Sequence, residues 1–318
     1  MKLFKQIMSI ILVIALFASF NFSIWFLLTR RCYDNYGTTS MAKMIELENY
    51  MPFDENSLIV KVDSDFKITE NVPVLDGATA LLPIYSAVIN AVYPDDCVIH
   101  DGEDFTADSA MQYKNTLRGY KAIVDGDTDI LFCAGPSAAQ AEYAKEKGVE
   151  LEYVPIGKEA FVFLVNSKNP VEDLSQEEIR GIYAGRYKNW KDVGGTNRVI
   201  NPLTRLEGSG SQTALVNFLG NEKIGKKSPL AFTGGTLGFS FRYYVEGIVG
   251  NSGVKMVSVD GVYPDVENIK NGSYPIVSQF YAIYRKDNTN ENIQPLIEWL
   301  LSEEGQYIIE ESGYVGIN

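Results

Sequence analysis

The most informative chemistry in this sequence lies in the segment Thr204–Leu219, which reads TRLEGSGSQTALVNFL. Two glycines let the backbone bend and approach a ligand closely, and a helix is predicted from Gln212 onward. The first turn of a helix offers unpaired N–H groups and the positive end of the helix dipole. Ser209 and Ser211 add hydroxyl donors, and Arg205 offers a planar guanidinium that matches two oxygens of a tetrahedral anion. The segment therefore predicts an anion site, with a plain helix cap beside a surface salt bridge as the alternative.

Other glycine-rich motifs do not fit this segment. A Walker A loop needs a lysine after its second glycine, and a dinucleotide-binding fingerprint needs a third glycine. Gly208-Ser209-Gly210 also has the wrong spacing for the nucleophile elbow of a hydrolase. Within the same segment, Glu207 could hold the guanidinium in place or accept a proton from a protonated oxyanion.

A second segment, Asp76–Leu81 (DGATAL), joins a predicted strand to a predicted helix. Thr79 and the amides after it could donate to the same anion from an opposing lobe, or Thr79 could simply cap the helix. Thr116, near the start of another predicted helix, is a third candidate donor. Glycine- and hydroxyl-rich helix starts at separate places in the chain predict a clamp around an anion.

The bulk composition fits a globular protein and limits its partners. The chain has 318 residues, of which 46% are hydrophobic and 22% charged, enough for one large domain or two ordinary ones. Its formal net charge of −13 argues against nucleic acid or an anionic lipid surface as a partner. Cys32, Cys97 and Cys133 are far apart without a CxxC pair, and His100 is the single histidine, so we expect no metal, no other cofactor and no Ser-His-Asp triad.

The N-terminal segment is expected to anchor the chain in a membrane. Ile7–Leu28 is an apolar run of about 22 residues, and a helix rising about 1.5 Å per residue would cross a hydrocarbon core of about 30 Å. This run is longer than the apolar region of a signal peptide, and no small-x-small cleavage site follows it. We therefore expect residues 1–29 to be an uncleaved anchor, with a cleaved signal segment as the alternative.

Helical and strand-like patterns alternate after the anchor. Residues 30–70 are predicted to be a juxtamembrane stretch and a leading strand, with a short helix at Met41–Tyr50 and the strand at Leu58–Val62. The predicted later strands are Val72–Leu75, Asp129–Ala134, Glu150–Pro155, Phe161–Asn166, Val199–Pro202, Met256–Val259 and Tyr274–Tyr284. The predicted helices are Ala80–Tyr93, Asn115–Val124, Ala138–Lys147, Leu174–Tyr183, one from Gln212 and a final one at Gln294–Glu310. This alternation indicates an α/β fold built from βαβ units.

Three segments resemble the phosphate-binding proteins of ABC transporters. They are DGATALLPIYSAVINAVYP at 76–94, PIGKEAFVFLVNSKNPVEDLSQEEIRGIYAGRYKNWKDVGG at 155–195 and TRLEGSGSQTAL at 204–215. The resemblance covers most of residues 72–318, and its middle string is the most specific. It implies a two-lobed, type II periplasmic-binding-protein-like fold with a hinge and central mixed sheets, closing over a dehydrated oxyanion without a metal. We expect lobe 1 at residues 71–157 plus 256–318, and lobe 2 at 158–255.

The same resemblance implies a set of ligand-binding residues on both lobes. They are Thr79, Leu81 and Thr116 on the first lobe, and Arg205, Glu207, Ser209, Gly210 and Ser211 on the second. Glu207 stands where better-studied members have aspartate. Members that prefer dibasic phosphate carry an aspartate after the strand Asp129–Ala134, whereas this chain reads Cys133–Ser137 (CAGPS). Glu207 is then the only evident proton acceptor, Ser137 could supply a donor instead, and the choice between phosphate and sulfate stays open.

The sequence predicts an extracytoplasmic solute-binding protein that captures phosphate or a similar tetrahedral oxyanion between two lobes. It would deliver the anion to an ABC transporter permease, and it would sit at the outer face of the cell membrane, tethered only by its N-terminal helix. The alternative is a membrane-tethered sensor or interaction module that has kept the binding-protein fold. An enzyme such as a phosphatase is not expected.

Overall fold

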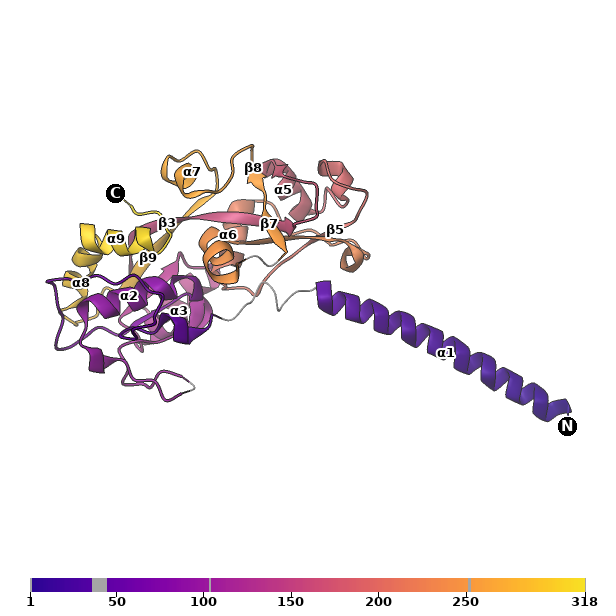
Figure 1. The fold of residues 1–318 in the computed structure, drawn as a ribbon, viewed down its shortest axis with the longest axis horizontal. Coiled ribbons are helices and arrows are strands. Elements are labelled where there is room, and N and C mark those ends of the chain that lie inside the picture. Colours follow the sequence, from indigo (N-terminus) through magenta and orange to yellow (C-terminus); the bar gives the residue numbers. More distant parts are fainter. Residues whose placement is uncertain (1, 36–44, 103, 251–252, 318) are drawn as a thin grey trace.

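The computed structural model describes the whole chain except residues 1, 36–44, 103, 251–252 and 318. The N-terminal helix α1 (Lys2–Asn35) extends away from the rest of the fold (Figure 1). Its segment Gln6–Trp25 is long and apolar enough to cross a membrane, and none of that segment is buried within the chain. This helix coincides with the predicted apolar run Ile7–Leu28.

The remainder of the chain is a mixed α/β structure, which confirms the predicted fold class. Its strands are β1 (Leu75–Gly77), β2 (Ile130–Ala134), β3 (Leu151–Asn166), β4 (Asp173–Leu174), β5 (Ile200–Pro202), β6 (Gly235–Phe241), β7 (Val254–Met256), β8 (Ser258–Val259) and β9 (Val277–Arg285). Its α-helices are α2 (Leu82–Val92), α3 (Asn115–Asp125), α4 (Ala138–Glu146), α5 (Gln176–Ala184), α6 (Gly210–Leu219), α7 (Val266–Lys270), α8 (Ile293–Leu300) and α9 (Glu303–Glu311). Short 3₁₀ turns are η1 (Leu47–Tyr50), η2 (Thr79–Leu81), η3 (Asp95–Cys97), η4 (Trp190–Val193) and η5 (Ala231–Thr233), and η6 (Tyr244–Val249) is a π-helix.

The long strand β3 joins the two halves of the fold (Figure 1). Its first part, Leu151–Ala160, pairs antiparallel with β9. Its second part, Phe161–Asn166, pairs antiparallel with β6 and β7. The outer pairs β1–β2 and β5–β6 are parallel, so the sheets on both sides are mixed. One continuous backbone therefore passes from one half of the molecule into the other.

The prediction of two separate strands at Glu150–Pro155 and Phe161–Asn166 was wrong, because β3 is continuous through both. Gly157 sits at a bulge, where the register with β9 shifts between Pro155 and Gly157. A bulge bends and twists a strand without ending it. The glycine is also required by close packing, since an added Cβ would lie 2.2 Å from the ring of Phe280.

Replacing Gly157 with alanine should therefore destabilise the fold. The added Cβ would lie within 3.0 Å of three atoms of the Phe280 ring, so the ring must shift and we expect a loss of about 1–3 kcal/mol from overpacking. Urea unfolding followed by circular dichroism would measure it. Gly135→Ala is the matched control, because the nearest atom to its added Cβ is 3.9 Å away. Equal stability of the two variants would contradict the assigned packing.

Two large hydrophobic cores lie on either side of the bend in β3. The first is built mainly from α2, β1, β2, β9, α8 and α9, with the smaller cluster under α3 and α4 beside it. The second is built mainly from the C-terminal part of β3, α5, α6 and β6. We call the parts around these cores the first and the second lobe.

The predicted first lobe included residues 256–276, yet Met256, Val257, Val259, Ile269, Tyr274 and Ile276 pack in the second core. They do so because β7 pairs with the end of β3 and β8 pairs with β4.

Further expectations differ from the structure: the predicted strand Met256–Val259 is divided between the end of β7 and β8, and the predicted strand Val72–Leu75 meets β1 only at Leu75. No strand forms at Leu58–Val62, where Ile59 is buried in the first core while Leu58 is largely exposed. The predicted final helix Gln294–Glu310 is two helices, α8 and α9, because the chain turns at Leu301–Ser302. The predicted helix Met41–Tyr50 lies partly outside the described residues, and its described end forms only η1.

Candidate functional site

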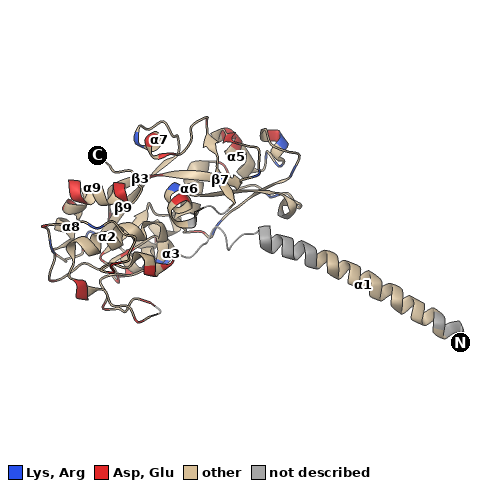
Figure 2. Cartoon of the chain, viewed as in Figure 1, with Lys and Arg blue, Asp and Glu red and all other residues tan. Residues whose placement is uncertain are grey.

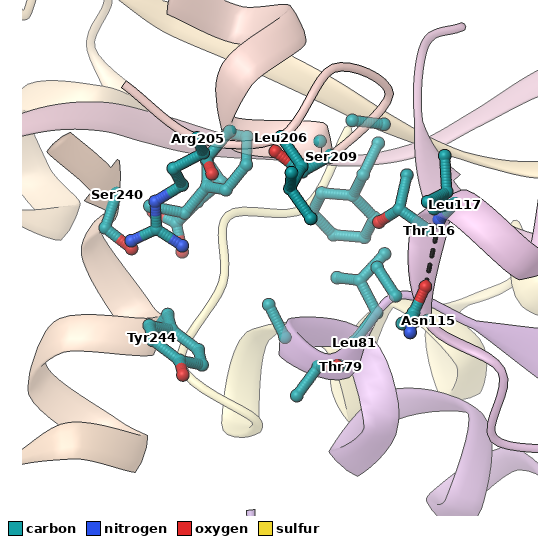
Figure 3. Close-up of a pocket in the computed structure, with 18 of the residues that line it drawn as sticks. Thr79, Leu81, Asn115, Thr116, Leu117, Arg205, Leu206, Ser209, Ser240 and Tyr244 are labelled. Atoms are coloured by element: carbon teal, nitrogen blue, oxygen red, sulfur yellow. Dashed lines mark hydrogen bonds between the residues drawn. The ribbon is translucent and has the colours of Figure 1, made fainter. Parts of the chain in front are cut away.

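A cavity of about 340 Å³ lies between the two lobes (Figure 3). The first lobe lines it with residues from η2, from the start of α3 and from the end of β2. The second lobe lines it with the loop before α6, the first turn of α6, the end of β6 and Tyr244 of η6. Glu159, Phe280 and Tyr314 complete the lining where the two lobes join. The cavity thus collects the ends of elements from both cores.

The second-lobe side of the cavity is a tight turn that leads into a helix. Gly208 has a φ of +81°, a conformation that favours glycine, and the chain then enters α6 with Ser209 as its N-cap. The Ser209 hydroxyl accepts a hydrogen bond from the backbone N–H of Gln212 at 3.3 Å. Gly210 and Ser211 occupy the first turn, where backbone N–H groups have no helical acceptor. These N–H groups and the helix dipole are the features that favour an anion.

The first-lobe side is organised by a buried carboxylate, that of Asp76. It accepts hydrogen bonds from the backbone N–H groups of Gly77 at 2.8 Å and Lys114 at 2.9 Å. Burial raises the pKa of Asp76, while these two hydrogen bonds act in the opposite direction. Asp76 therefore ties the turn before Thr79 to the residues just before α3, which carries Thr116. The Thr79 hydroxyl in turn accepts a hydrogen bond from Tyr113 at 3.3 Å.

The two lobes also touch each other beside the cavity. The side-chain amide of Gln140, in α4, donates to the carbonyl of Gly208 at 3.1 Å. Leu117 packs so closely against the same turn that a Cβ on Gly208 would lie 2.6 Å from its methyl group. An added Cβ on Gly210 would likewise lie 3.5 Å from the Thr116 hydroxyl. The helix starts of α3 and α6 are therefore neighbours across the site.

Arg205 is the only cation among the described residues that line the cavity. Its guanidinium donates to the carbonyl of Phe239 at 3.2 Å and lies 5.6 Å from the ring centre of the same residue. Among the ion pairs formed by the described residues, none includes Arg205. Burial lowers the pKa of Arg205, against the opposing effect of Tyr244 and Tyr183. A partly buried guanidinium without a carboxylate partner among the described residues favours an anion from outside the chain.

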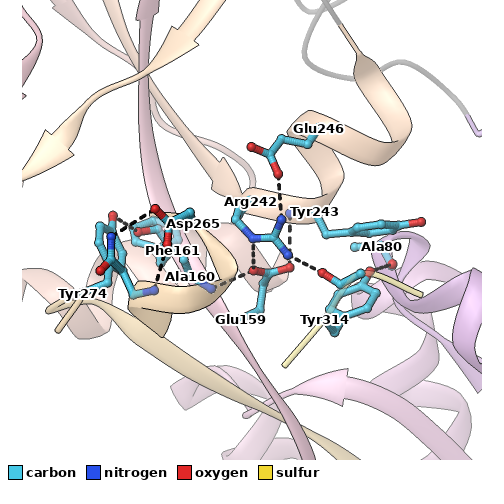
Figure 4. Close-up of polar contacts among 12 residues, drawn as sticks. Ala80, Glu159, Ala160, Phe161, Arg242, Tyr243, Glu246, Asp265, Tyr274 and Tyr314 are labelled. Atoms are coloured by element: carbon cyan, nitrogen blue, oxygen red, sulfur yellow. Dashed lines mark hydrogen bonds and ion pairs between the residues drawn. The ribbon is translucent and has the colours of Figure 1, made fainter. Parts of the chain in front are cut away.

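Glu159 is the only carboxylate in the lining, and it is already engaged (Figure 4). One oxygen accepts from the backbone N–H of Ala160 at 2.8 Å, and the other from that of Tyr243 at 3.1 Å. Arg242 forms an ion pair with it at 3.3 Å, and both side chains are 5% exposed. Burial raises the pKa of Glu159 to about 7, against the opposing Arg242 charge and both backbone hydrogen bonds. This carboxylate neutralises Arg242, not Arg205.

The Glu159–Arg242 pair also connects to the turn η2 of the first lobe (Figure 4). Arg242 donates to Glu246 at 2.6 Å and to the carbonyl of Gly313. The next residue, Tyr314, donates its hydroxyl to the carbonyl of Ala80 in η2. A chain of polar contacts therefore runs from the hinge strand β3 to the turn that carries Thr79.

The structure brings together seven of the eight residues predicted to bind the ligand. Thr79, Leu81, Thr116, Arg205, Ser209, Gly210 and Ser211 all line the cavity. Glu207 does not: its side chain is exposed, and the turn at Gly208 follows it. Ser137, considered as an alternative donor, caps α4 in a reciprocal arrangement with Gln140 and is not in the lining either. Whether the lining residues bind a ligand remains a prediction.

Changing Glu207 to glutamine tests its predicted role. An exposed carboxylate outside the cavity should contribute little, so we expect the dissociation constant for an oxyanion to change by about twofold or less. Isothermal titration of the variant beside the parent chain would measure this. A tenfold loss would restore Glu207 as a proton acceptor or as a partner of Arg205.

Sequence reasoning missed several lining residues, including Asn115, Glu159, Ser240, Phe280 and Tyr314. The aromatic run 239–244 (FSFRYY) is a partial signal, because such a run is typical either of a cleft wall or of packing between helix and sheet. The structure divides it: Phe239 is fully buried in the second core, whereas Phe241 and Tyr244 line the cavity. Glu159 and Phe280 carried no local motif, since they reach the site through the pairing of β3 with β9.

Two further observations bear on the chemistry of the site. No group of three or more His, Cys, Asp or Glu side chains that could hold a metal occurs among the described residues. Acidic side chains are spread over outer helices such as α5, α7 and α9 (Figure 2). The long-range field of a chain with net charge −13 would repel an anion, so attraction must come from the local donors in the cavity.

Comparison with known proteins agrees with this architecture. A family model described as the PBP superfamily domain matches residues 74–304, well over half of the chain. The chain therefore belongs to the PBP superfamily.

Individual relatives narrow the comparison. The phosphate-binding protein PstS of Bacillus subtilis is 27% identical over 259 residues, covering 76% of this chain and 80% of the relative. The PstS of Borreliella burgdorferi is 24% identical over 180 residues, covering 50% of this chain and 63% of that one. Among solved structures, a putative phosphate ABC transporter substrate-binding protein with bound phosphate from Clostridium perfringens aligns with a TM-score of 0.57 at 23% identity. It covers 79% of this chain and 100% of its own. At such identity the structural likeness establishes the fold.

Proposed function

We propose that this chain is an extracytoplasmic binding protein that captures phosphate or a similar tetrahedral oxyanion. The observation that carries the proposal is Arg205, a partly buried cation with no carboxylate partner among the described residues. It faces a cavity that also receives the first turn of α6. The names of the relatives support phosphate as the first ligand to test.

In this proposal, the anion is held from both lobes. The Arg205 guanidinium would donate a pair of charged hydrogen bonds to the anion. The backbone N–H groups of Gly210 and Ser211, at the N-terminus of α6, would also donate to it. Hydroxyls of Ser209, Ser211, Thr79 and Thr116 would donate to the remaining oxygens, and backbone near Leu81 would close the first-lobe side.

The chain would divide into a first lobe at 71–157 plus 277–318 and a second lobe at 158–276. The latter boundary differs from the expected 255 because residues 256–276 pack in the second core.

The N-terminal helix would tether this binding unit to the outer face of the cell membrane. Its span Gln6–Trp25 has the length and composition for it, and the unit would deliver its anion to an ABC transporter permease. Alkaline extraction of membranes would test the tether: an anchored chain stays in the membrane pellet, whereas a chain released by signal cleavage appears in the soluble fraction.

Isothermal titration of the ligand-free, full-length chain in detergent micelles tests the binding function. We expect a saturable heat with inorganic phosphate, with sulfate titrated separately and in competition. Absence of binding with either anion, from protein shown to be folded by circular dichroism, would overturn the proposal.

A further inference from the structure

The turn that leads into α6 is held from the opposite lobe as well as from its own. Within the second lobe, the side-chain oxygen of Gln212 accepts a hydrogen bond from the backbone N–H of Arg205 at 2.6 Å. The carbonyl of Gly208 instead accepts from the side chain of Gln140, in the first lobe, at 3.1 Å. Gln140 and Gly208 are both buried, and a buried carbonyl without a donor would cost free energy. The turn is therefore completed by a residue of the other lobe.

The two partners of the Gln140 amide fix its orientation. Its oxygen accepts from the backbone N–H of Ser137 at 2.8 Å, as part of the capping box at the start of α4. Its nitrogen is then directed at the Gly208 carbonyl, because the reversed amide would place oxygen against oxygen. One planar group thus connects the start of α4 in the first lobe to the turn before α6 in the second.

An apolar contact crosses the same boundary. Leu117, in the first turn of α3, approaches Gly208 so closely that an added Cβ would lie 2.6 Å from its methyl carbon. Among the described residues, those that line the cavity include Leu117 but not Gln140. Leu117 offers an apolar side chain, and Gln140 directs its amide at the backbone. Both contacts join atoms of the chain directly, so bringing the lobes together over them requires no ligand atom.

We propose that Gln140 is a positioning residue that holds the two lobes together and fixes the Gly208 turn before a ligand binds. It acts through the turn and does not touch the ligand. Its effect on affinity rests on the proposed oxyanion site. A turn already in its binding arrangement needs less ordering on binding, and the apparent affinity rises with the population of the competent state. One buried hydrogen bond should change that affinity by about 2- to 10-fold.

Gln140→Glu tests the contact between the lobes selectively. Glutamate at this position keeps the capping box, as Glu178 does at the start of α5, but it has no N–H to donate to Gly208. Hydrogen–deuterium exchange of the full-length, phosphate-free chain in detergent micelles would be followed by mass spectrometry. We expect segments 114–118 and 205–212 to exchange about 2- to 10-fold faster than in the parent chain, while α4 exchanges at the parent rate.

Ala141→Glu is the matched control for the added charge. It places a carboxylate at the next, exposed position of α4 and leaves the Gln140 amide intact, so it should exchange like the parent chain. Unchanged exchange in Gln140→Glu, or faster exchange confined to α4, would overturn the inference and leave the oxyanion function standing. A purely local role of Gln140 as a helix cap predicts one of those two results.

Titration with inorganic phosphate gives the second readout. We expect Gln140→Glu to bind phosphate about 2- to 10-fold less tightly than Ala141→Glu, and saturating phosphate to return segment 205–212 to the parent exchange rate. Equal affinities of the two variants would overturn the effect on binding. If the parent chain binds no oxyanion, the proposed function fails, while the exchange comparison still decides whether Gln140 holds the lobes together.

Discussion

Replacing Arg205 with alanine is expected to weaken oxyanion binding by about 2–5 kcal/mol, which corresponds to roughly 30- to 4,000-fold in the dissociation constant. The guanidinium is the only cation in the lining, and no ion pair of the described residues compensates it. Its loss removes both the charge and the forked pair of hydrogen bonds that match two oxygens of the ligand. Isothermal titration with inorganic phosphate would measure the effect.

Two further variants make the Arg205 result specific. Arg205→Lys keeps the charge and loses the planar fork, so its affinity should fall between those of the alanine variant and the parent chain. Arg186→Ala is the matched control on the same lobe, because Arg186 is 42% exposed and pairs with Glu177 and Glu222 at the surface. It should bind like the parent. Equal affinities for Arg205→Ala and Arg186→Ala would show that the site is misplaced.

Replacing Arg242 with methionine is expected to destabilise the folded chain by about 3–5 kcal/mol at pH 8. The change removes the ion pairs with Glu159 and Glu246 and the hydrogen bond to Gly313. It leaves Glu159 as a buried carboxylate that has lost its cationic partner. Urea unfolding at fixed pH would measure the loss.

The same variant should show a characteristic dependence on pH. Burial already raises the pKa of Glu159 to about 7, above its ordinary 4.5, and loss of the Arg242 charge would raise it further. Stabilisation by the protonated carboxyl is therefore fully present below about pH 4.5 and is lost as pH rises through the folded-state pKa. Arg242→Met should be closest to the parent chain near pH 5 and furthest from it above pH 8. A pH-independent difference would contradict the raised pKa.

A double variant and a surface pair serve as controls. In Glu159→Gln/Arg242→Met no charge remains to be buried, so part of the stability should return and the excess pH dependence should disappear. Lys270→Met breaks an exposed pair with Glu310, 3.4 Å apart, and should cost about 1 kcal/mol or less. A double variant no more stable at pH 8 than Arg242→Met would show that the buried charge of Glu159 is not the cause.

The N-terminal span and most individual elements were determined by local sequence. An uninterrupted apolar run predicts a helix long enough for a membrane whatever surrounds it, and the structure has that helix. The predicted helix Leu174–Tyr183 corresponds to α5, whose start is fixed by a capping box at Ser175 and Glu178, because both hydrogen bonds form within one turn. The glycine-rich turn and the start of α6 were predicted for the same reason.

The positions of the ligand-site residues were predicted only where a local motif marked them. Thr79, Thr116 and the 205–211 segment stand at turns and helix starts, whose unpaired N–H groups are a property of local backbone geometry. The resemblance to a known family added their assignment to opposing lobes. Glu207 belonged to the same motif, but its orientation depends on the turn at Gly208, and the structure places it outside the cavity.

Only the tertiary structure decided how the lobes are joined and what else faces the ligand. The continuity of β3, the assignment of residues 256–276 to the second core and the pairing of Glu159 with Arg242 all depend on contacts between distant segments. Such contacts leave no periodic or motif signal, because each partner is selected by the shape and charge of a neighbour far away in the chain. The sequence by itself therefore determined a helix long enough to cross a membrane and a helix start whose unpaired N–H groups suit an anion. The packing of the two lobes determined a cavity with aromatic side chains in which Arg205 is the one cation among the described lining residues.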